Sequence, residues 1–188
     1  GLGLLHPLNP RFFGCQALVL CPTRELADQV AKDLRRLARG SDNVKVLTLC
    51  GGVPMGPQIG SLEHGAQVIV GTPGRVQKHL SKGTLSLDGL NTLVLDEADR
   101  MLDMGFIRDI RKILALLPAK RQNLLFSATF SNEIRTLAEG LLDNPVQVEV
   151  AARNTAAESI KQSVYPVDQS QKTALLSKLV RDNGWEQV

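Results

Sequence analysis

Short apolar runs alternate with amphipathic segments through most of this chain. Runs rich in aliphatic and β-branched residues predict buried strands, which we place at 17–21, 44–49, 68–70, 92–95, 123–126 and 146–150. Between these runs, apolar residues recur every three or four positions, which predicts helices. Strands that alternate with helices favour a parallel sheet covered on both faces, so we expect an α/β fold.

The predicted helices have recognisable beginnings and ends. One follows Arg24, buries Leu26, Val30, Leu34 and Leu37, and stops at Gly40. A short helix is predicted around 58–63, and another begins at Thr72-Pro73 and ends at Gly83. A single helix is predicted over 106–117, stopped by Pro118, and Ser131 is expected to cap one more.

The alternation stops after Val150. Residues 151–161 are small and polar and resemble a linker, and a short extended piece (162–167) and a helix around 175–180 follow. We therefore expect one domain over 1–150, and over 151–188 a linker with the beginning of a second domain.

The composition is that of a globular protein, with 43% hydrophobic and 22% charged residues. The net charge of +3 permits a polyanionic partner without requiring one. No apolar run reaches membrane-spanning length and no secretory signal is visible. Cys15, Cys21 and Cys50 lack metal-binding spacing, so we expect buried reduced thiols and a cytoplasmic protein without membrane contact.

Three carboxylates follow the predicted strand at 92–95, in the stretch Asp96-Glu97-Ala98-Asp99. Ligands of parallel α/β sheets bind at the carboxyl ends of strands. On an extended backbone Asp96 and Glu97 diverge, so one can serve a hard cation and the other a water molecule. Taken alone, the stretch is equally typical of a polar turn.

Other polar motifs also follow predicted strands, and a parallel sheet brings them to one edge. They are Pro22-Thr23-Arg24, Gly51-Gly52, Thr72-Pro73-Gly74-Arg75 and Ser127-Ala128-Thr129. The arginines lie near helix N-termini and suit phosphate, and the paired glycines let a polymer approach the main chain. Because aromatic residues are few, we expect contact with a nucleic-acid backbone rather than base stacking. Singly, each motif is typical of a helix cap or a surface arginine.

The order and spacing of Asp-Glu-Ala-Asp, Pro-Thr-Arg-Glu-Leu-Ala, Thr-Pro-Gly-Arg and Ser-Ala-Thr resemble those of the first RecA-like domain of DEAD-box RNA helicases. Residues up to about 105 resemble the bacterial DbpA type, whereas the stretch from Met104 onward, especially 117–122, resembles the RhlE type. The resemblance implies a RecA-like P-loop NTPase domain whose mostly parallel sheet is flanked by helices. It also implies ATP-dependent unwinding or remodelling of RNA duplexes.

The resemblance further implies roles for individual residues. Asp96 binds the Mg²⁺ of ATP through water, and Glu97 positions the hydrolytic water. Asp99 engages Ser127, Ala128 and Thr129 and couples hydrolysis to strand separation. One RNA strand is contacted through phosphates and 2′-hydroxyls, in a sequence-independent way, by Pro22, Thr23, Arg24, Gly51, Gly52, Thr72, Pro73, Gly74 and Arg75.

The sequence lacks a P-loop, since no glycine is followed by lysine. Residues 1–8 resemble the helix that follows the P-loop in the family, so we expect a domain truncated at both ends. In the family fold the P-loop strand lies beside the Ser-Ala-Thr strand, and its loss should leave an unpaired edge and marginal stability. The fragment by itself is therefore expected to be inactive.

Two alternatives remain open at this point. One is a non-catalytic RNA-binding or interaction module derived from a helicase domain. The other is a relative that acts on DNA.

Overall fold

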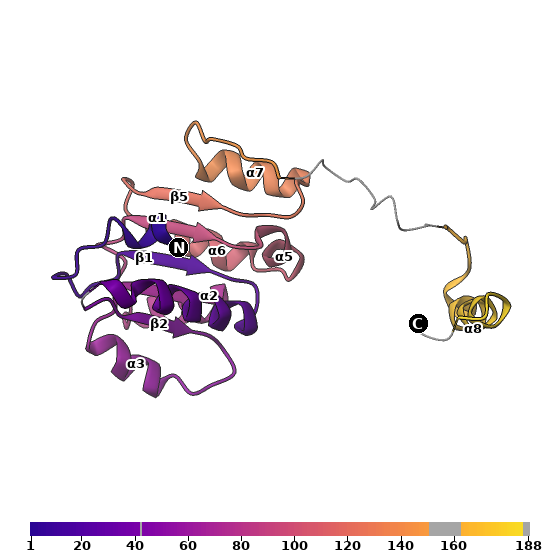
Figure 1. The fold of residues 1–188 in the computed structure, drawn as a ribbon, viewed down its shortest axis with the longest axis horizontal. Coiled ribbons are helices and arrows are strands. Elements are labelled where there is room, and N and C mark those ends of the chain that lie inside the picture. Colours follow the sequence, from indigo (N-terminus) through magenta and orange to yellow (C-terminus); the bar gives the residue numbers. More distant parts are fainter. Residues whose placement is uncertain (42, 151–162, 186–188) are drawn as a thin grey trace. The chain divides into compact units, whose positions relative to one another are not determined.

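Five parallel strands form one sheet in the order β2-β3-β1-β4-β5 (Figure 1). The computed structural model describes residues 1–41, 43–150 and 163–185, and the chain divides into two units, Gly1–Arg153 and Asn154–Val188. The sheet lies in the first unit and confirms the predicted parallel α/β fold. Its strands are β1 (Ala17–Leu20), β2 (Val46–Leu49), β3 (Val68–Gly71), β4 (Thr92–Leu95) and β5 (Gln122–Leu125).

The central strands are apolar on both faces. Leu18, Ile69 and Leu93 are fully buried in the core on one face, and Ala17 and Val68 are fully buried in the core on the other. Successive residues of a strand point to opposite faces, so such continuous burial requires helices on both sides.

One face is covered by α1 (Leu2–Leu5) and α2 (Arg24–Leu37), which is followed by the 3₁₀ turn Ala38–Gly40. The apolar face of α2 differs from the prediction, because Ala27 and Ala31 are its most deeply buried residues and Leu37 is 45% exposed. Alanines carry little side chain, so they let the helix lie close to the sheet and shift the line of contact away from Leu37.

The helices α4 (Pro73–Ser81), α5 (Ala98–Asp103), α6 (Ile107–Leu114) and α7 (Asn132–Leu141) contribute to the core on the other face. The prediction of one helix over 106–117 is wrong in its bounds, and α5 was missed. Gly105 adopts a left-handed conformation (φ +80°) that ends α5 and re-aims the chain into α6. The predicted short helix is present as α3 (Gly56–Glu63), and Ser131 caps α7 by accepting from the Ile134 N–H.

The predicted strand over 146–150 is wrong. Val146, Val148 and Val150 belong to no strand and are 91%, 79% and 96% exposed. A strand needs a hydrogen-bonded neighbour, and within the described residues β5 pairs only with β4 and forms an edge of the sheet.

The second unit contains the turn Gln169–Gln171 and α8 (Lys172–Asp182), which confirms the helix predicted around 175–180. The predicted linker at 151–161 lies outside the described residues, and residues 163–168 form no strand. Within the described part of the chain, no helix is long and apolar enough to cross a membrane.

The three cysteines are buried and free, as predicted. Burial raises the pKa of Cys15 and of Cys21 to about 12 and also raises the pKa of Cys50. Thiols held in the protonated form are poor nucleophiles and poor metal ligands. We therefore assign these cysteines to the core.

Candidate functional site

The strand register aligns the carboxyl ends of all five strands. Leu20 pairs with Gly71 and Leu95, while Leu49 pairs with Gly71 and Leu125 with Leu95. The residues that follow these positions therefore emerge along one edge of the sheet, as the sequence predicted. The strand order divides this edge, because the glycine and arginine motifs follow β2, β3 and β1, and the acids and the Ser-Ala-Thr motif follow β4 and β5.

The acid stretch leaves the sheet through a sharp turn. The Asp96 N–H still donates to the carbonyl of Leu20 at 3.0 Å, but Glu97 adopts a left-handed conformation (φ 50°, ψ 54°). The expectation of an extended backbone across both acids is therefore wrong. The turn starts α5, whose Ala98 N–H donates to the Phe126 carbonyl at 2.9 Å. A non-glycine residue held in this conformation stores about 1–3 kcal/mol of strain, which is common at functional sites.

Asp96 is half-buried and has no ion-pair partner among the described residues, whereas Glu97 pairs with Arg100 at 3.4 Å. Burial, with the neighbouring Glu97 charge as a smaller contribution, raises the pKa of Asp96. A cation at Asp96 would therefore relieve an unfavourable charge. No group of three His, Cys, Asp or Glu side chains in the described part could hold a metal alone. A lone carboxylate fits Mg²⁺, which keeps several waters and takes further oxygens from substrate phosphates.

Asp99 joins the acid stretch to the Ser-Ala-Thr motif. Its Oδ2 accepts from both the N–H and the hydroxyl of Thr129, each at 2.9 Å, and the Ser127 hydroxyl donates to the Thr129 carbonyl at 2.7 Å. Partial burial raises the pKa of Asp99, but hydrogen bonds from Thr129, the Arg100 N–H and Ser127 outweigh it and hold that pKa below its usual value. The two motifs thus form one hydrogen-bonded unit.

Arg75 is fixed by a network that the sequence did not reveal. Its guanidinium donates to Gln58 Oε1 and to the Val53 carbonyl, both at 2.8 Å. The same Gln58 Oε1 lies 3.0 Å from Nε2 of the fully buried His79, and Gln58 Nε2 donates to the Cys50 carbonyl at 3.0 Å. Gln58, on α3, therefore connects Arg75 and His79 of α4 to the loop Gly51–Val53, which we call the glycine loop.

Burial, reinforced by the nearby charges of Arg75 and Lys82, lowers the pKa of His79. Gln58 Oε1 is an acceptor, so the neutral ring carries its proton on Nε2 and donates it to Gln58. Nδ1 lies 2.9 Å from the Thr84 Oγ1, whose hydroxyl donates to the His79 carbonyl at 3.1 Å. The bond to Gln58 needs only this one ring proton, so it forms with an uncharged histidine.

Arg24 also lies against the loop Gly51–Val53. Its Nη1 occupies the space that a Cβ at Gly52 would take. Gly52 has φ +77°, a backbone conformation that favours glycine at this position. With Arg75 bonded to the Val53 carbonyl, both arginines lie at the Gly51–Val53 loop.

The two threonines differ in their roles as helix caps. The Thr23 hydroxyl caps α2 by accepting from the Leu26 N–H, whereas Thr72 makes no side-chain cap for α4.

The fold and this edge define a class of protein, a RecA-like α/β domain that carries acids and arginines on its strand-end loops. The DEAD/DEAH box helicase family model matches residues 2–137. The chain belongs to this family.

Individual relatives agree. Over 180 residues the chain is 52% identical to the ATP-dependent RNA helicase DbpA of Escherichia coli, covering 96% of this chain and 39% of the relative. It is 43% identical to the ATP-dependent RNA helicase CshA of Listeria monocytogenes, covering 96% of this chain and 34% of the relative. A crystal structure of a DEAD box protein from Methanococcus jannaschii matches with a TM-score of 0.72 and 38% identity, covering 93% of this chain and 46% of that one. The chain thus spans less than half of each of these proteins.

Proposed function

We propose that the full-length protein is an ATP-dependent RNA helicase that remodels RNA duplexes, and that residues 1–150 supply the acid, coupling and RNA-binding parts of its first RecA-like domain. In this proposal residues 151–188 are a linker and the start of a second domain. The proposal rests on the two hydrogen bonds between Asp99 and Thr129. They connect the acid stretch after β4, which suits hydrolysis, to the Ser-Ala-Thr motif after β5 on the same edge.

The acids have separate roles in this proposal. Asp96 would hold the Mg²⁺ of bound ATP through a water molecule, and the lack of a cationic partner for it among the described residues supports that assignment. The bound ion supplies positive charge to the phosphate oxygens. Glu97 orients the attacking water and can accept its proton, and its left-handed backbone directs it differently from a residue in the strand. Changes in the bound nucleotide are transmitted through Asp99 and the motif Ser127, Ala128 and Thr129.

The other half of the edge binds RNA. Arg24 and Arg75 provide charge for phosphates, and both lie at the glycine loop, where main chain is accessible to a polymer. The proposed RNA-binding surface also includes Pro22, Thr23, Gly51, Gly52, Thr72, Pro73 and Gly74. Gln58 positions Arg75, so less ordering is required when a phosphate arrives.

The test compares the full-length protein with its Glu97→Gln variant. We expect ATPase activity that RNA stimulates and DNA does not, unwinding of an RNA duplex, and loss of about 100-fold or more of the turnover in the variant. RNA binding without ATPase activity in the unmodified protein would favour the non-catalytic module instead, and equal stimulation by DNA would favour a relative acting on DNA.

Residues 1–188 alone are expected to be inactive. Their sequence contains no Gly-Lys pair and hence no P-loop, and phosphate positioning accounts for much of phosphoryl-transfer catalysis. RNA-stimulated turnover by these residues alone would refute this.

A further inference from the structure

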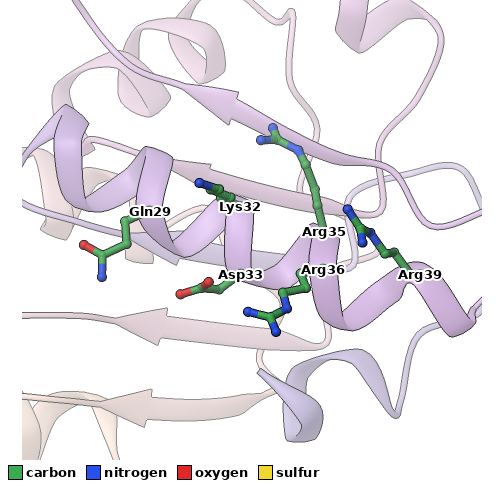
Figure 2. A pocket seen from close by; sticks show the side chains of 6 residues that line it. All are labelled: Gln29, Lys32, Asp33, Arg35, Arg36 and Arg39. Carbon is green, nitrogen blue, oxygen red and sulfur yellow. The ribbon is translucent and has the colours of Figure 1, made fainter.

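A basic patch lies on the solvent side of α2 and of the 3₁₀ turn that follows it, formed by Lys32, Arg35, Arg36 and Arg39. These side chains, with Gln29 and Asp33, line an open depression of about 500 Å³. Figure 2 labels the six side chains. All four cationic residues are exposed. None of the residues to which we assign RNA binding at the strand-end loops lines this depression.

The charge of the basic patch is not neutralised within the described residues. None of its four cations has an ion-pair partner there, and Asp33 is the single acid that lines the depression. Arg35 donates through Nε and Nη2 to the Val46 carbonyl, at 3.2 and 3.0 Å, so its guanidinium is fixed against β2. The helix dipole favours cations in the last turn, but Lys32 lies outside that turn.

The basic patch is well separated from the strand-end site. Arg24 begins α2 and Arg36 follows twelve residues later, which corresponds to about 18 Å along the helix axis. The contact of Arg35 with Val46, the first residue of β2, puts the patch near the amino ends of the strands. A single nucleotide cannot reach both places, whereas a polymer of phosphates can. No aromatic residue lines the depression, so recognition would be of backbone rather than bases.

We propose that the basic patch is a second RNA contact, which binds the phosphate backbone of a duplex or folded segment adjoining the strand bound at the strand-end site. The choice of RNA as the polyanion rests on the proposed function. Such a contact would favour substrates with a structured flank over bare single strands.

The test uses the full-length protein with Arg36→Gln/Arg39→Gln. The control, Arg111→Gln/Lys112→Gln, removes the same charge from exposed positions of α6, which packs on the opposite face of the sheet. The probes are a single-stranded RNA of roughly six nucleotides and the same strand with a duplex extension. Circular dichroism melting establishes that both variants remain folded.

We expect the patch variant to bind the short strand within about twofold of the unmodified protein and the extended RNA about tenfold more weakly. The slope of log affinity against log salt for the extended RNA should fall by roughly 1.8, which is two lost phosphate contacts. The control should change neither quantity.

Equal binding of the extended RNA by the patch variant and the control would overturn the inference and leave the proposed function standing. Equal weakening on both probes would also overturn it, because the patch would then not discriminate a flank. Failure of the unmodified protein to bind either RNA would contradict the inference and the proposed function together.

Discussion

Asp99 Oδ2 accepts two hydrogen bonds from Thr129, one from the main-chain N–H and one from the hydroxyl, across thirty residues of sequence. The acid lies in the first turn of α5, two residues after Glu97, and the threonine follows β5. A change at Asp96 or Glu97 therefore has a short physical route to a neighbouring motif. Contiguous hydrogen bonds can carry coupling when they have two arrangements.

Thr129→Val in the full-length protein should uncouple the two motifs. It removes one of the two bonds to Asp99, which should cost about 1 kcal/mol of unfolding free energy. ATPase activity should stay within about threefold, because Asp96 and Glu97 are unchanged, while RNA unwound per ATP should fall about fivefold. Thr136→Val is the matched control, since that exposed hydroxyl donates only to its own helix at Asn132. Equal unwinding by both variants would exclude the coupling role.

Gln58→Leu should weaken RNA binding by releasing Arg75 and leaving His79 without its acceptor. We expect the RNA concentration for half-maximal ATPase stimulation to rise about tenfold, equivalent to about 1.4 kcal/mol, with the maximal rate little changed. Gln77→Leu on α4 is the control, because Gln77 donates to the Ser81 hydroxyl of the same helix. A fall in the maximal rate alone would mean that Gln58 does not position the arginine.

Asp96→Asn should stabilise the nucleotide-free protein at neutral pH while abolishing hydrolysis. Burial raises the pKa of Asp96 above its ordinary 3.8, so the folded state holds that proton more tightly than the unfolded state. The contribution of protonated Asp96 to the free energy of unfolding is fully present below pH 3.8. It is lost as the pH rises through the pKa of Asp96 in the folded state. The gain from the variant, measured by urea unfolding, should therefore shrink as pH falls towards 3.8.

Asp103→Asn, which removes an exposed carboxylate from α5, separates the effect of burial from that of net charge. A stability gain for Asp96→Asn that persists unchanged at pH 3.8 would contradict the assigned cause.

Residues 1–188 alone should self-associate. In the part of the chain that the structure describes, β5 pairs with β4 alone, and the exposed alternating valines at 146, 148 and 150 form a segment suited to pairing with its open edge. Val148→Lys should raise the concentration at which sedimentation detects oligomers, because a charge at an exposed strand position opposes edge pairing. A monomeric fragment with a sharp, high-temperature melt would contradict this.

Much of the architecture could be predicted because it depends on local pattern. The apolar run at 92–95 is β4 without change, and Ser131 caps its helix as the sequence indicates. The meeting of five motifs at one edge followed from parallel pairing alone.

The errors concern interactions that are not local. Val146, Val148 and Val150 have strand character, but no strand of the described ranges pairs with them. Burial of α2 depends on how closely its alanines approach the sheet. The left-handed Glu97 is set by the turn into α5, and residue preferences give no sign of it. Gln58 reaches Arg75 and His79 across 17 and 21 residues, so no single-sequence pattern marks it.

In the proposed function, bound nucleotide and bound RNA change each other's affinity through the shared edge of the sheet. The direct measurement is the affinity of the full-length protein for a single-stranded RNA, with and without a non-hydrolysable ATP analogue, in the unmodified protein and in Asp99→Ala. We predict that the analogue tightens RNA binding about tenfold or more in the unmodified protein and less than about twofold in the variant. Equal tightening in both proteins, or none in the unmodified one, would contradict the claim.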